Sequence, residues 1–306
     1  MSIIGIIILL ISTISILLVL LFHKWTKKLF RSYWFYLIFS ILYLIYFILI
    51  RYTNDLSFVI ENDFEYFKKY DPYTYSFKLS KVFLLDLCPF VSIFLPISLL
   101  IDKTRNTSKV ISIFGIIGGL LTIYGNLIFI DSINVPIWKF ILLGENPNYI
   151  MFSSHYFIMI LSFIVLLNSK KFTKWSILGT ILFILFFICY VLLISQLLDI
   201  QCNTTGLRIG DWINPYKKYF WYSQYAFLNK ILNLLYPYST IFWYSIASMF
   251  VFNIILFKNI MTKDEKLFTK LWWSKLNRID TKINKLLFNL ENSFKYLKKD
   301  KKMRNS

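Results

Sequence analysis

The chain has 306 residues, of which 57% are hydrophobic and 20% aromatic, and its mean hydropathy is +0.59. Soluble domains average about 45–50% apolar residues. Here the excess comes in blocks long enough to span a bilayer, which argues against an ordinary soluble protein. The net charge is +18. Because the basic residues lie in short loops and a tail beside apolar blocks, they indicate membrane orientation and anionic lipid, and no nucleic-acid partner is expected.

Seven apolar blocks predict transmembrane helices, because a bilayer core needs about 20 mostly apolar residues per helix. In chain order they are residues 2–22, 33–51, 81–101, 109–130, 149–168, 174–198 and 237–258. The first block has no basic segment before it and no small-residue cleavage site after it, so we interpret it as an anchor. The predicted fold class is an all-α, multi-pass helix bundle of about seven transmembrane helices in the cell membrane.

The loops between these blocks alternate in charge. Residues 23–32, 102–108 and 169–173 are basic on balance, whereas residues 52–80 and 131–148 carry more acidic than basic side chains. Positively charged loops stay in the cytoplasm. The N-terminus is therefore predicted outside and the C-terminus inside, and the longest loops leave room for re-entrant or interfacial helices.

The tail, residues 259–306, is predicted to form a unit separate from the transmembrane domain of residues 1–258. From residue 263 onward it holds 13 Lys or Arg and 5 Asp or Glu. Its apolar side chains recur at spacings of three and four, which predicts an amphipathic helix. They are Phe268, Trp272, Leu276, Ile279, Ile283, Leu286 and Leu290. The basic polar face favours contact with the anionic inner leaflet, and a short coiled coil is the alternative.

The notable polar residues inside the apolar blocks are Asp86 and Cys88 in the third, Asn126 in the fourth and His155 in the fifth, with Gln196 near the end of the sixth. A charged or strongly polar side chain in hydrocarbon costs about 2.5–3.5 kcal/mol on insertion scales, so it usually faces a cavity or a partner. At about 1.5 Å per helical residue, Cys88 and His155 each lie about 10 Å from the outer boundary, and Asn126 lies about 7–8 Å from it. The sequence therefore predicts one polar layer below the outer headgroups.

A thiol and an imidazole at one depth suggest covalent catalysis, because a histidine that takes the proton of a cysteine creates a nucleophilic thiolate. Asn126 or Asp86 would orient the imidazole or stabilise an oxyanion. Asp86 and Cys88 are only two residues apart and point to opposite sides of an ideal helix. Pro89 and Pro96 are expected to bend that helix and so relax the objection.

Each of these residues also has a structural interpretation. Cys88 can serve as a small buried hydrophobe, and His155 can belong to a polar network. Asn126 can hydrogen-bond between helices, and Asp86 can reach the membrane surface. No metal-ligand spacing and no phosphate-binding motif occurs, so neither a metal nor another cofactor is expected.

The segment "LLDLCPFVSIFLPISLLID", followed by "FGIIGGLLTIYGNLIF" and "MFSSHYFIMILSFIVLL", resembles the YwaF-like family of bacterial integral membrane proteins. The resemblance covers about residues 30–260 and is closest to members from wall-less, AT-rich bacteria. It implies a bundle of six or seven helices in which Cys88 and His155 form the reactive pair. Eukaryotic relatives of that family include a multi-span acyltransferase acting on ether lysophospholipids. Many members carry a second histidine two residues before the cysteine, where this chain has Asp86.

Two functional hypotheses follow. The first is a lipid acyltransferase whose site uses Cys88 and His155 and opens toward the outer leaflet, with a phospholipid as substrate. The second is a transporter or substrate-binding membrane subunit that holds a small solute in the same polar layer. A non-catalytic membrane protein is the third possibility.

Overall fold

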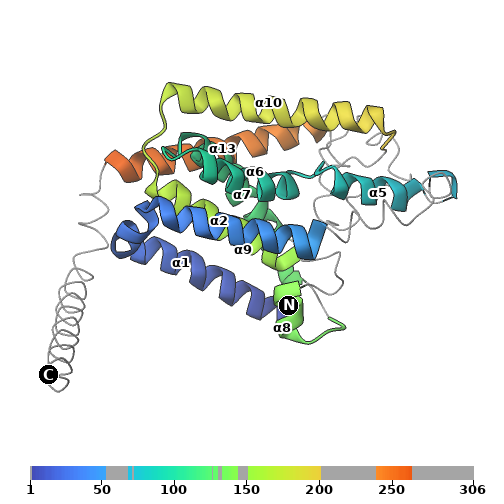
Figure 1. The fold of residues 1–306 in the computed structure, drawn as a ribbon, viewed down its shortest axis with the longest axis horizontal. Helices are drawn as coiled ribbons and strands as arrows, with labels where there is room; N and C mark the ends of the chain where they lie inside the picture. Colours follow the sequence, from blue (N-terminus) through green and yellow to red (C-terminus); the bar gives the residue numbers. More distant parts are fainter. Residues whose placement is uncertain are drawn as a thin grey trace, which may run out of the picture. The chain divides into compact units, whose positions relative to one another are not determined.

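The computed structural model describes residues 2–52, 68–70, 72–125, 127–129, 133–143, 151–200 and 239–263. Within them the regular structure is entirely helical (Figure 1). Two units are distinguished, Met1–Leu256 and Phe257–Ser306. The predicted tail helix lies outside the described residues, apart from the end of the last helix of the bundle.

Six long helices make up most of the described part of the first unit. They are α1 (Ile3–Arg31), α2 (Tyr33–Tyr46), α6 (Leu87–Ile101), α7 (Asn106–Gly125), α9 (Met151–Asn168) and α10 (Lys174–Leu197). Shorter elements are η1 (Phe47–Tyr52), which continues α2 as a π-helix, α5 (Pro72–Val82), η2 (Leu127–Phe129) and α8 (Ile137–Leu143). The last described helix is α13 (Ser239–Lys263), whose Val251, Ile254 and Ile255 pack against the core.

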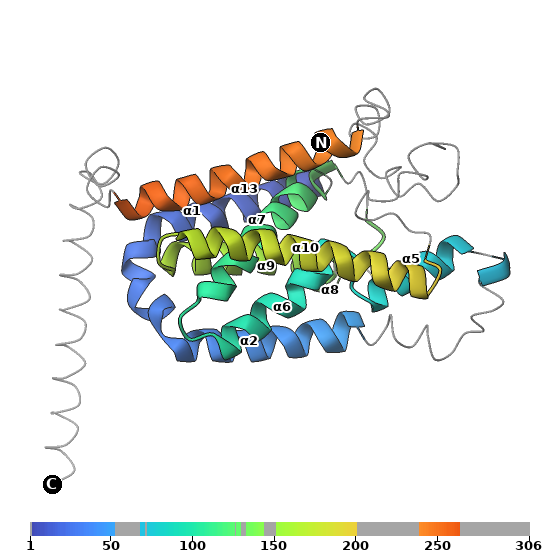
Figure 2. The same cartoon turned by 90° about the horizontal axis from the view of Figure 1, so that it is seen from above.

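Helices that follow one another along the chain run in alternating directions through the bundle (Figure 2). Tyr33 at the start of α2 donates a hydrogen bond to the carbonyl of Leu100 at the end of α6, over 2.8 Å. Ser98 near the end of α6 bonds Ser108 near the start of α7, over 3.0 Å. We call the end at which α7 begins the Lys109 end, and the end at which α6 begins the Cys88 end.

Helix α7 lies at the centre of the bundle. In its most apolar 18-residue window 78% of the residues are buried, against 17% in α1 and in α10. Its glycines explain this position, because they let α6 and α9 approach closely. A Cβ atom built on Gly115 would lie 2.1 Å from the Ser162 Oγ of α9. Gly115 therefore allows α9 to pack closely against α7.

Five helical segments among the described residues are long and apolar enough to cross a membrane, fewer than the seven predicted. They are Ile3–Phe22, Tyr33–Ile50, Lys78–Ile101, Asn106–Gly125 and Lys174–Leu197. The other two predicted blocks correspond to shorter apolar stretches, Phe152–Asn168 and Ser245–Ile260.

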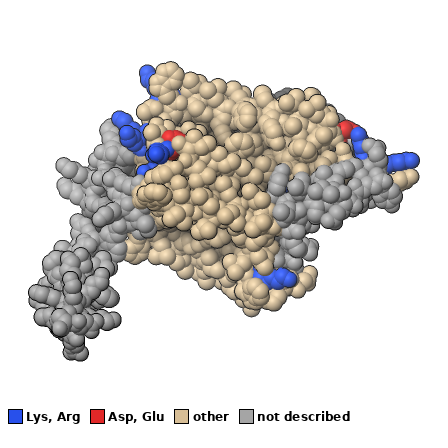
Figure 3. All heavy atoms as spheres, viewed as in Figure 1, with Lys and Arg blue, Asp and Glu red and all other residues tan. Residues whose placement is uncertain are grey.

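Charged side chains lie toward the ends of the helices. On the face shown in Figure 3, Lys, Arg, Asp and Glu gather at the two ends and near one lower edge, and the middle carries none. The exposed basic residues Lys103, Lys170, Lys171 and Lys174 belong to the turns at the Lys109 end. This distribution fits a helix bundle whose middle faces hydrocarbon.

The turn at the Lys109 end is held by specific polar contacts. Asp102 accepts hydrogen bonds from the backbone N–H groups of Thr104 (2.9 Å) and Thr107 (2.7 Å), which anchors the first turn of α7. Arg105 donates to the carbonyl of Phe30 at the end of α1 (3.2 Å), and its guanidinium lies 4.9 Å from the centre of the Tyr36 ring. Buried Lys109 donates to the carbonyl of Lys171 (3.3 Å). These contacts join the α1–α2, α6–α7 and α9–α10 connections.

The third predicted span is broken where a kinked helix was expected. Helix α5 ends at Val82 and α6 begins at Leu87, so residues 83–86 separate them. Leu84 has a left-handed backbone (φ 54°), and the N–H groups of Leu84 and Leu85 bond the carbonyls of Lys81 and Ser80. This is a Schellman cap that stops α5. Pro89 therefore falls in the first turn of α6, where its missing N–H has no helical acceptor to lose.

Candidate functional site

Cys88 lies in the first turn of α6 and faces α7. Its sulfur is 2.7 Å from the position that a Cβ atom would occupy at Gly118. The hydroxyl of Thr122, one helical turn further along α7, lies beside the thiol, and Tyr43 of α2 is a third neighbour. Three helices therefore enclose the sulfur.

His155 lies near the start of α9, which packs against another face of α7. Its backbone carbonyl oxygen is 3.0 Å from the Cβ position at Gly119, and its side chain is half-buried. The ring Nδ1 lies 3.4 Å from the hydroxyl of Ser154, in a contact whose donor depends on the imidazole tautomer. The ring thus has a polar neighbour on its own helix.

Cys88 and His155 flank adjacent residues of the same helix. Gly118 contacts the thiol and Gly119 contacts the carbonyl of His155, so both residues lie at one level along α7. The two glycines are about 100° apart around the helix axis, and α6 and α9 pack against these different faces. Within the described residues no hydrogen bond joins the thiol to the imidazole, so the predicted reactive pair stays a prediction.

Asp86 immediately precedes α6 and forms an ion pair with Lys81 at the end of α5. The two side chains are only 12% and 10% exposed, so the pair is largely withdrawn from solvent. Asp86 occupies the N-cap position of α6 but makes no side-chain capping bond. Its charge and that of Lys81 both act on the neighbouring thiol of Cys88. The carboxylate therefore bridges the break between α5 and α6, a role that sequence reasoning did not consider.

Asn126, the fourth predicted site residue, lies outside the described residues. In the sequence it follows Gly125, the last residue of α7.

Tyr43, Ser92 and Thr122 surround Cys88 but were not selected from the sequence. The Ser92 hydroxyl donates to the carbonyl of Cys88 over 2.9 Å, and the Tyr43 hydroxyl lies near both residues. Hydroxyl-bearing residues are common in this aromatic-rich chain, so none stands out by type alone. A signal was available for Tyr43 alone, because Tyr36, Ser40 and Tyr43 recur at helical intervals within one apolar block.

A second polar contact lies near His155. Tyr46 of α2 shares a hydrogen bond of 2.6 Å with Ser153 of α9 and also donates to the carbonyl of Leu142 at the end of α8. This contact ties α2, α8 and α9 together at the Cys88 end. It fixes the start of α9, where His155 is found.

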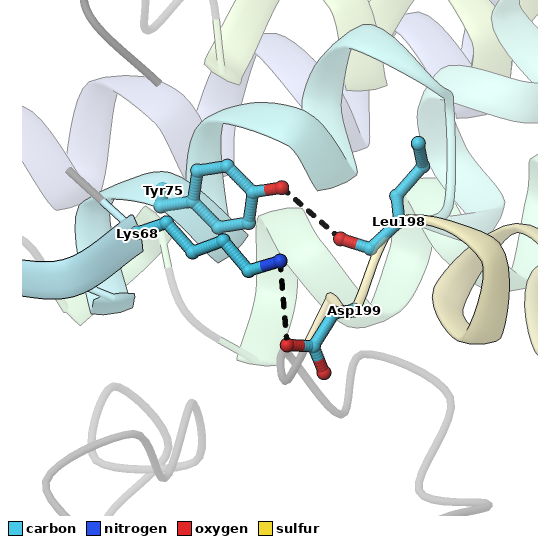
Figure 4. Close-up of polar contacts among 4 residues, drawn as sticks. All are labelled: Lys68, Tyr75, Leu198 and Asp199. Carbon is cyan, nitrogen blue, oxygen red and sulfur yellow. Dashed lines mark hydrogen bonds and ion pairs between the residues drawn. The ribbon is translucent and has the colours of Figure 1, made fainter. Parts of the chain in front are cut away.

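The break that precedes Cys88 is held by α10. The hydroxyl of Tyr75 in α5 donates to the carbonyl of Leu198 at the end of α10 over 3.1 Å (Figure 4). Conversely, the hydroxyl of Tyr190 in α10 donates a hydrogen bond to the carbonyl of Phe83 at the end of α5. Each helix thus supplies a tyrosine that satisfies a C-terminal carbonyl of the other, a group that lacks an intrahelical donor.

Apolar side chains also pack together at this junction between α5 and α10. Both helices end in a Schellman cap, with Leu84 (φ 54°) and Asp199 (φ 52°) in the left-handed conformation. The residues after them, Leu85 and Ile200, are fully buried in one cluster. Lys68 and Asp199 add an exposed ion pair of 3.8 Å, also drawn in Figure 4. The junction positions Asp86 and Cys88 through the short segment that follows α5.

No group of three or more His, Cys, Asp or Glu side chains suited to a metal ion occurs in the described part of the chain. The described free cysteines are Cys88 and Cys189. Cys189 is exposed on α10, away from the predicted site, so Cys88 is the described thiol of that site.

The fold and this arrangement define an all-α protein with several helices capable of crossing a membrane. Residues 10–304 match the family model described as DUF5378, a family of unknown function, and the chain belongs to that family. It is 32% identical over 201 residues to the uncharacterised protein MG135 of Mycoplasma genitalium, covering 64% of this chain and 70% of that protein. It is also 34% identical over 141 residues to the MG135 homologue of Mycoplasma pneumoniae, covering 45% of this chain and 49% of that protein.

No solved structure matches the chain significantly. None of the matches supports the resemblance to the YwaF-like family or to an acyltransferase.

Proposed function

We propose that the chain is a multi-pass membrane protein that transfers an acyl group between lipids through Cys88, with His155 as general base and acid. The observation that carries the proposal is the placement of Cys88 and His155 against consecutive residues of α7, Gly118 and Gly119. An enclosed thiol and an imidazole at one level of a helix bundle are the two groups that thioester chemistry requires.

The membrane part of the proposal is supported by the five long apolar helices and by the charge-free middle of the face in Figure 3. Alternating helix directions fit the alternating charge of the loops. In the proposed orientation the Lys109 end faces the cytoplasm, since its turns carry Lys103, Lys170 and Lys171. The Cys88 end then lies near the outer leaflet.

The proposed reaction has two steps. His155 takes the proton of Cys88, the thiolate attacks the ester carbonyl of a phospholipid, and the departing alcohol oxygen takes the proton from His155. The acyl group is then held as a thioester on Cys88. In the second step His155 takes the proton of a lysophospholipid hydroxyl as that oxygen attacks the thioester, and the released thiolate regains the proton. Thr122, beside the thiol, is the described candidate for binding the oxyanion, and Asn126 keeps its role predicted from sequence.

The test is to trap the acyl-enzyme. Purified protein in vesicles containing a phospholipid with an alkyne-bearing acyl chain is denatured, and the label is detected and challenged with neutral hydroxylamine, which cleaves thioesters. A variant that retains only Cys88 (Cys189→Ala, Cys202→Ala) is expected to be labelled, and the matched variant that retains only Cys189 is expected not to be. Equal labelling of wild type and Cys88→Ala would refute the proposal.

A transporter or solute-binding subunit is the second candidate, favoured by the break between α5 and α6. Membrane transporters commonly bind substrate at discontinuous helices, and here the break carries the Lys81–Asp86 pair and adjoins Cys88. This candidate predicts solute uptake that is lost in His155→Leu and unchanged in Cys88→Ala. The acyltransferase proposal predicts that the two substitutions act alike.

A further inference from the structure

The three tryptophans whose side chains the structure describes are all exposed. Trp34, Trp138 and Trp175 are 68%, 61% and 80% exposed. Each is the second residue of a helix, of α2, α8 and α10 respectively. Tryptophan is highly buried on average in soluble proteins, whereas membrane proteins place it at the two membrane–water interfaces, where its ring is apolar and its N–H stays wet. These three residues therefore mark candidate membrane boundaries.

The tryptophans lie at opposite ends of the bundle. Helices α2 and α10 begin at the Lys109 end, where the turns are basic. Helix α8 lies at the Cys88 end, because the carbonyl of its Leu142 accepts a hydrogen bond from Tyr46 at the end of α2. Between the two ends α7 extends over 20 residues, or about 30 Å. The hydrocarbon core of a bilayer is also about 30 Å thick.

The exposed side of α8 is apolar. Phe140 is buried in one cluster with Ile123 near the end of α7, and it attaches α8 to the end of the bundle. At about 100° per residue, Ile137, Trp138 and Leu142 lie together on the opposite side of the helix, and all three are exposed. We call these three side chains the α8 face.

Several features suit this face to a lipid surface. In Figure 1 α8 runs across the direction of α1, α2 and α9, so it lies parallel to the plane of a bilayer that those helices cross. Exposed apolar side chains of the adjoining elements continue the face, among them Ile3 of α1 and Ile48 of η1. Lys139 is the one charged residue of α8 and is exposed, which suits phospholipid headgroups.

We propose that α8 lies in the plane of the membrane at the Cys88 end and inserts Ile137, Trp138 and Leu142 among the lipids of that leaflet. The bilayer is then bounded by Trp138 on one side and by Trp34 and Trp175 on the other. The occupant of the α8 face is the leaflet itself, because the face continues the exposed apolar sides of the spanning helices. The proposal rests on the membrane part of the proposed function and not on acyl transfer.

This boundary bears on the candidate site. Tyr46, which bonds Leu142 of α8, also bonds Ser153, and His155 follows two residues later along α9. Two residues advance a helix by about 3 Å, so the imidazole lies just inside the boundary that α8 sets. The ester groups of phospholipids lie where headgroups meet hydrocarbon. Helix α8 therefore holds the site at the level of the bonds that acyl transfer breaks.

Photoreactive lipids test this placement on the full chain in vesicles. One probe phospholipid carries a diazirine close to its glycerol and the other at the end of an acyl chain, and mass spectrometry maps the residues that react. The α8 face is expected to react at least about threefold more with the glycerol probe, as an interfacial helix should. Leu185 and Phe186, exposed in the middle of α10, should show the reverse preference. Phe140 is the internal control, because it is buried on the same short helix and should react with neither probe.

Tryptophan fluorescence gives an independent readout. The emission lost in Trp138→Phe relative to wild type isolates the signal of Trp138. Lipids brominated near the glycerol end of an acyl chain are expected to quench that signal more strongly than lipids brominated near the chain end. Trp34→Phe and Trp175→Phe are the matched controls, and their difference signals should show the same shallow depth.

The outcomes separate this proposal from the proposed function. If the chain-end probe labels α10 but neither probe labels α8, the placement of α8 is overturned and the membrane part of the proposed function stands. Preferential reaction of α8 with the chain-end probe, or contact of the α8 face with a second copy of the chain instead of lipid, would also overturn it. If no residue reacts with either lipid, the membrane part fails as well. Neither readout measures acyl transfer.

Discussion

The sulfur of Cys88 lies 2.7 Å from the position that a Cβ atom would take at Gly118, so this glycine is what admits the thiol to the centre of the bundle. The contact joins α6 to α7 at the level where α9 brings His155 against Gly119. The packing around Cys88 can therefore be tested by adding one methyl group to α7 at Gly118.

Gly118→Ala is expected to destabilise the protein by about 1–3 kcal/mol, the usual effect of overpacking a filled core. Adding Cys88→Ala removes the sulfur that the new methyl group meets, so the double variant should be more stable than the sum of the two single effects predicts. The measurement is thermal unfolding in detergent. Gly125→Ala is the control, because nothing lies within 4 Å of a Cβ atom there; additive effects of Gly118→Ala and Cys88→Ala would contradict the described contact.

Removing one member of the Lys81–Asp86 pair should be costly. Both side chains are nearly buried, so Asp86→Ala removes the carboxylate that pairs with a largely buried ammonium, with an expected loss of about 3–5 kcal/mol. The double substitution Lys81→Met with Asp86→Leu removes both charges and should recover most of that loss. Chemical denaturation of wild type, Asp86→Ala and the double variant measures how much of the loss is recovered. If Asp86→Ala were as stable as wild type, the pair would not be the link across the break.

The reciprocal tyrosines of α5 and α10 should each stabilise their junction. Tyr75→Phe and Tyr190→Phe keep the buried rings but leave the carbonyls of Leu198 and Phe83 without these donors, an expected cost of about 1 kcal/mol each. Hydrogen–deuterium exchange should report faster opening at the ends of both helices in either variant. Tyr75→Leu removes both the hydroxyl and the ring, so comparing it with Tyr75→Phe separates the contribution of the hydroxyl to stability from that of the ring. Unchanged exchange at residues 79–85 and 194–200 would show that these bonds do not hold the junction.

The turn between α6 and α7 should be sensitive to acid. Partial burial raises the pKa of Asp102, but hydrogen bonds from Thr104 and Thr107 outweigh that effect, and the pKa lies below its ordinary value. A carboxyl whose pKa is lowered by folding contributes stability that is fully present above its unfolded pKa of about 3.9. That contribution is lost as the pH falls through the folded pKa. Unfolding curves of wild type and Asp102→Asn should therefore converge below about pH 4, and a constant difference across the acid range would contradict this role.

The sequence predicted the helical class well because apolar blocks of bilayer length have few other structures available. The prediction that Cys88 and His155 lie at one membrane depth stays a prediction; the structure places both against consecutive residues of α7. Sequence reasoning failed at the third span. Nothing in residues 83–86 signals a helix stop, because Leu84 takes a left-handed conformation that usually belongs to glycine. Only the tertiary contacts of Leu85 and the tyrosine pair enforce that conformation.

The role of Asp86 was missed for the same reason. Its partner Lys81 is five residues away, a separation that places two side chains on different faces of a continuous helix. The break between α5 and α6 turns them toward one another.

The most direct test of the central claim is acyl transfer by the purified protein in vesicles that contain a diacyl phospholipid and a labelled lysophospholipid. The account predicts transfer by wild type, and a loss of at least about a hundredfold in Cys88→Ala and in His155→Gln, as for removal of a nucleophile or its base. The Cys189→Ala control should retain full activity. Transfer that persists in Cys88→Ala, or no transfer by a folded wild-type protein, would contradict the account.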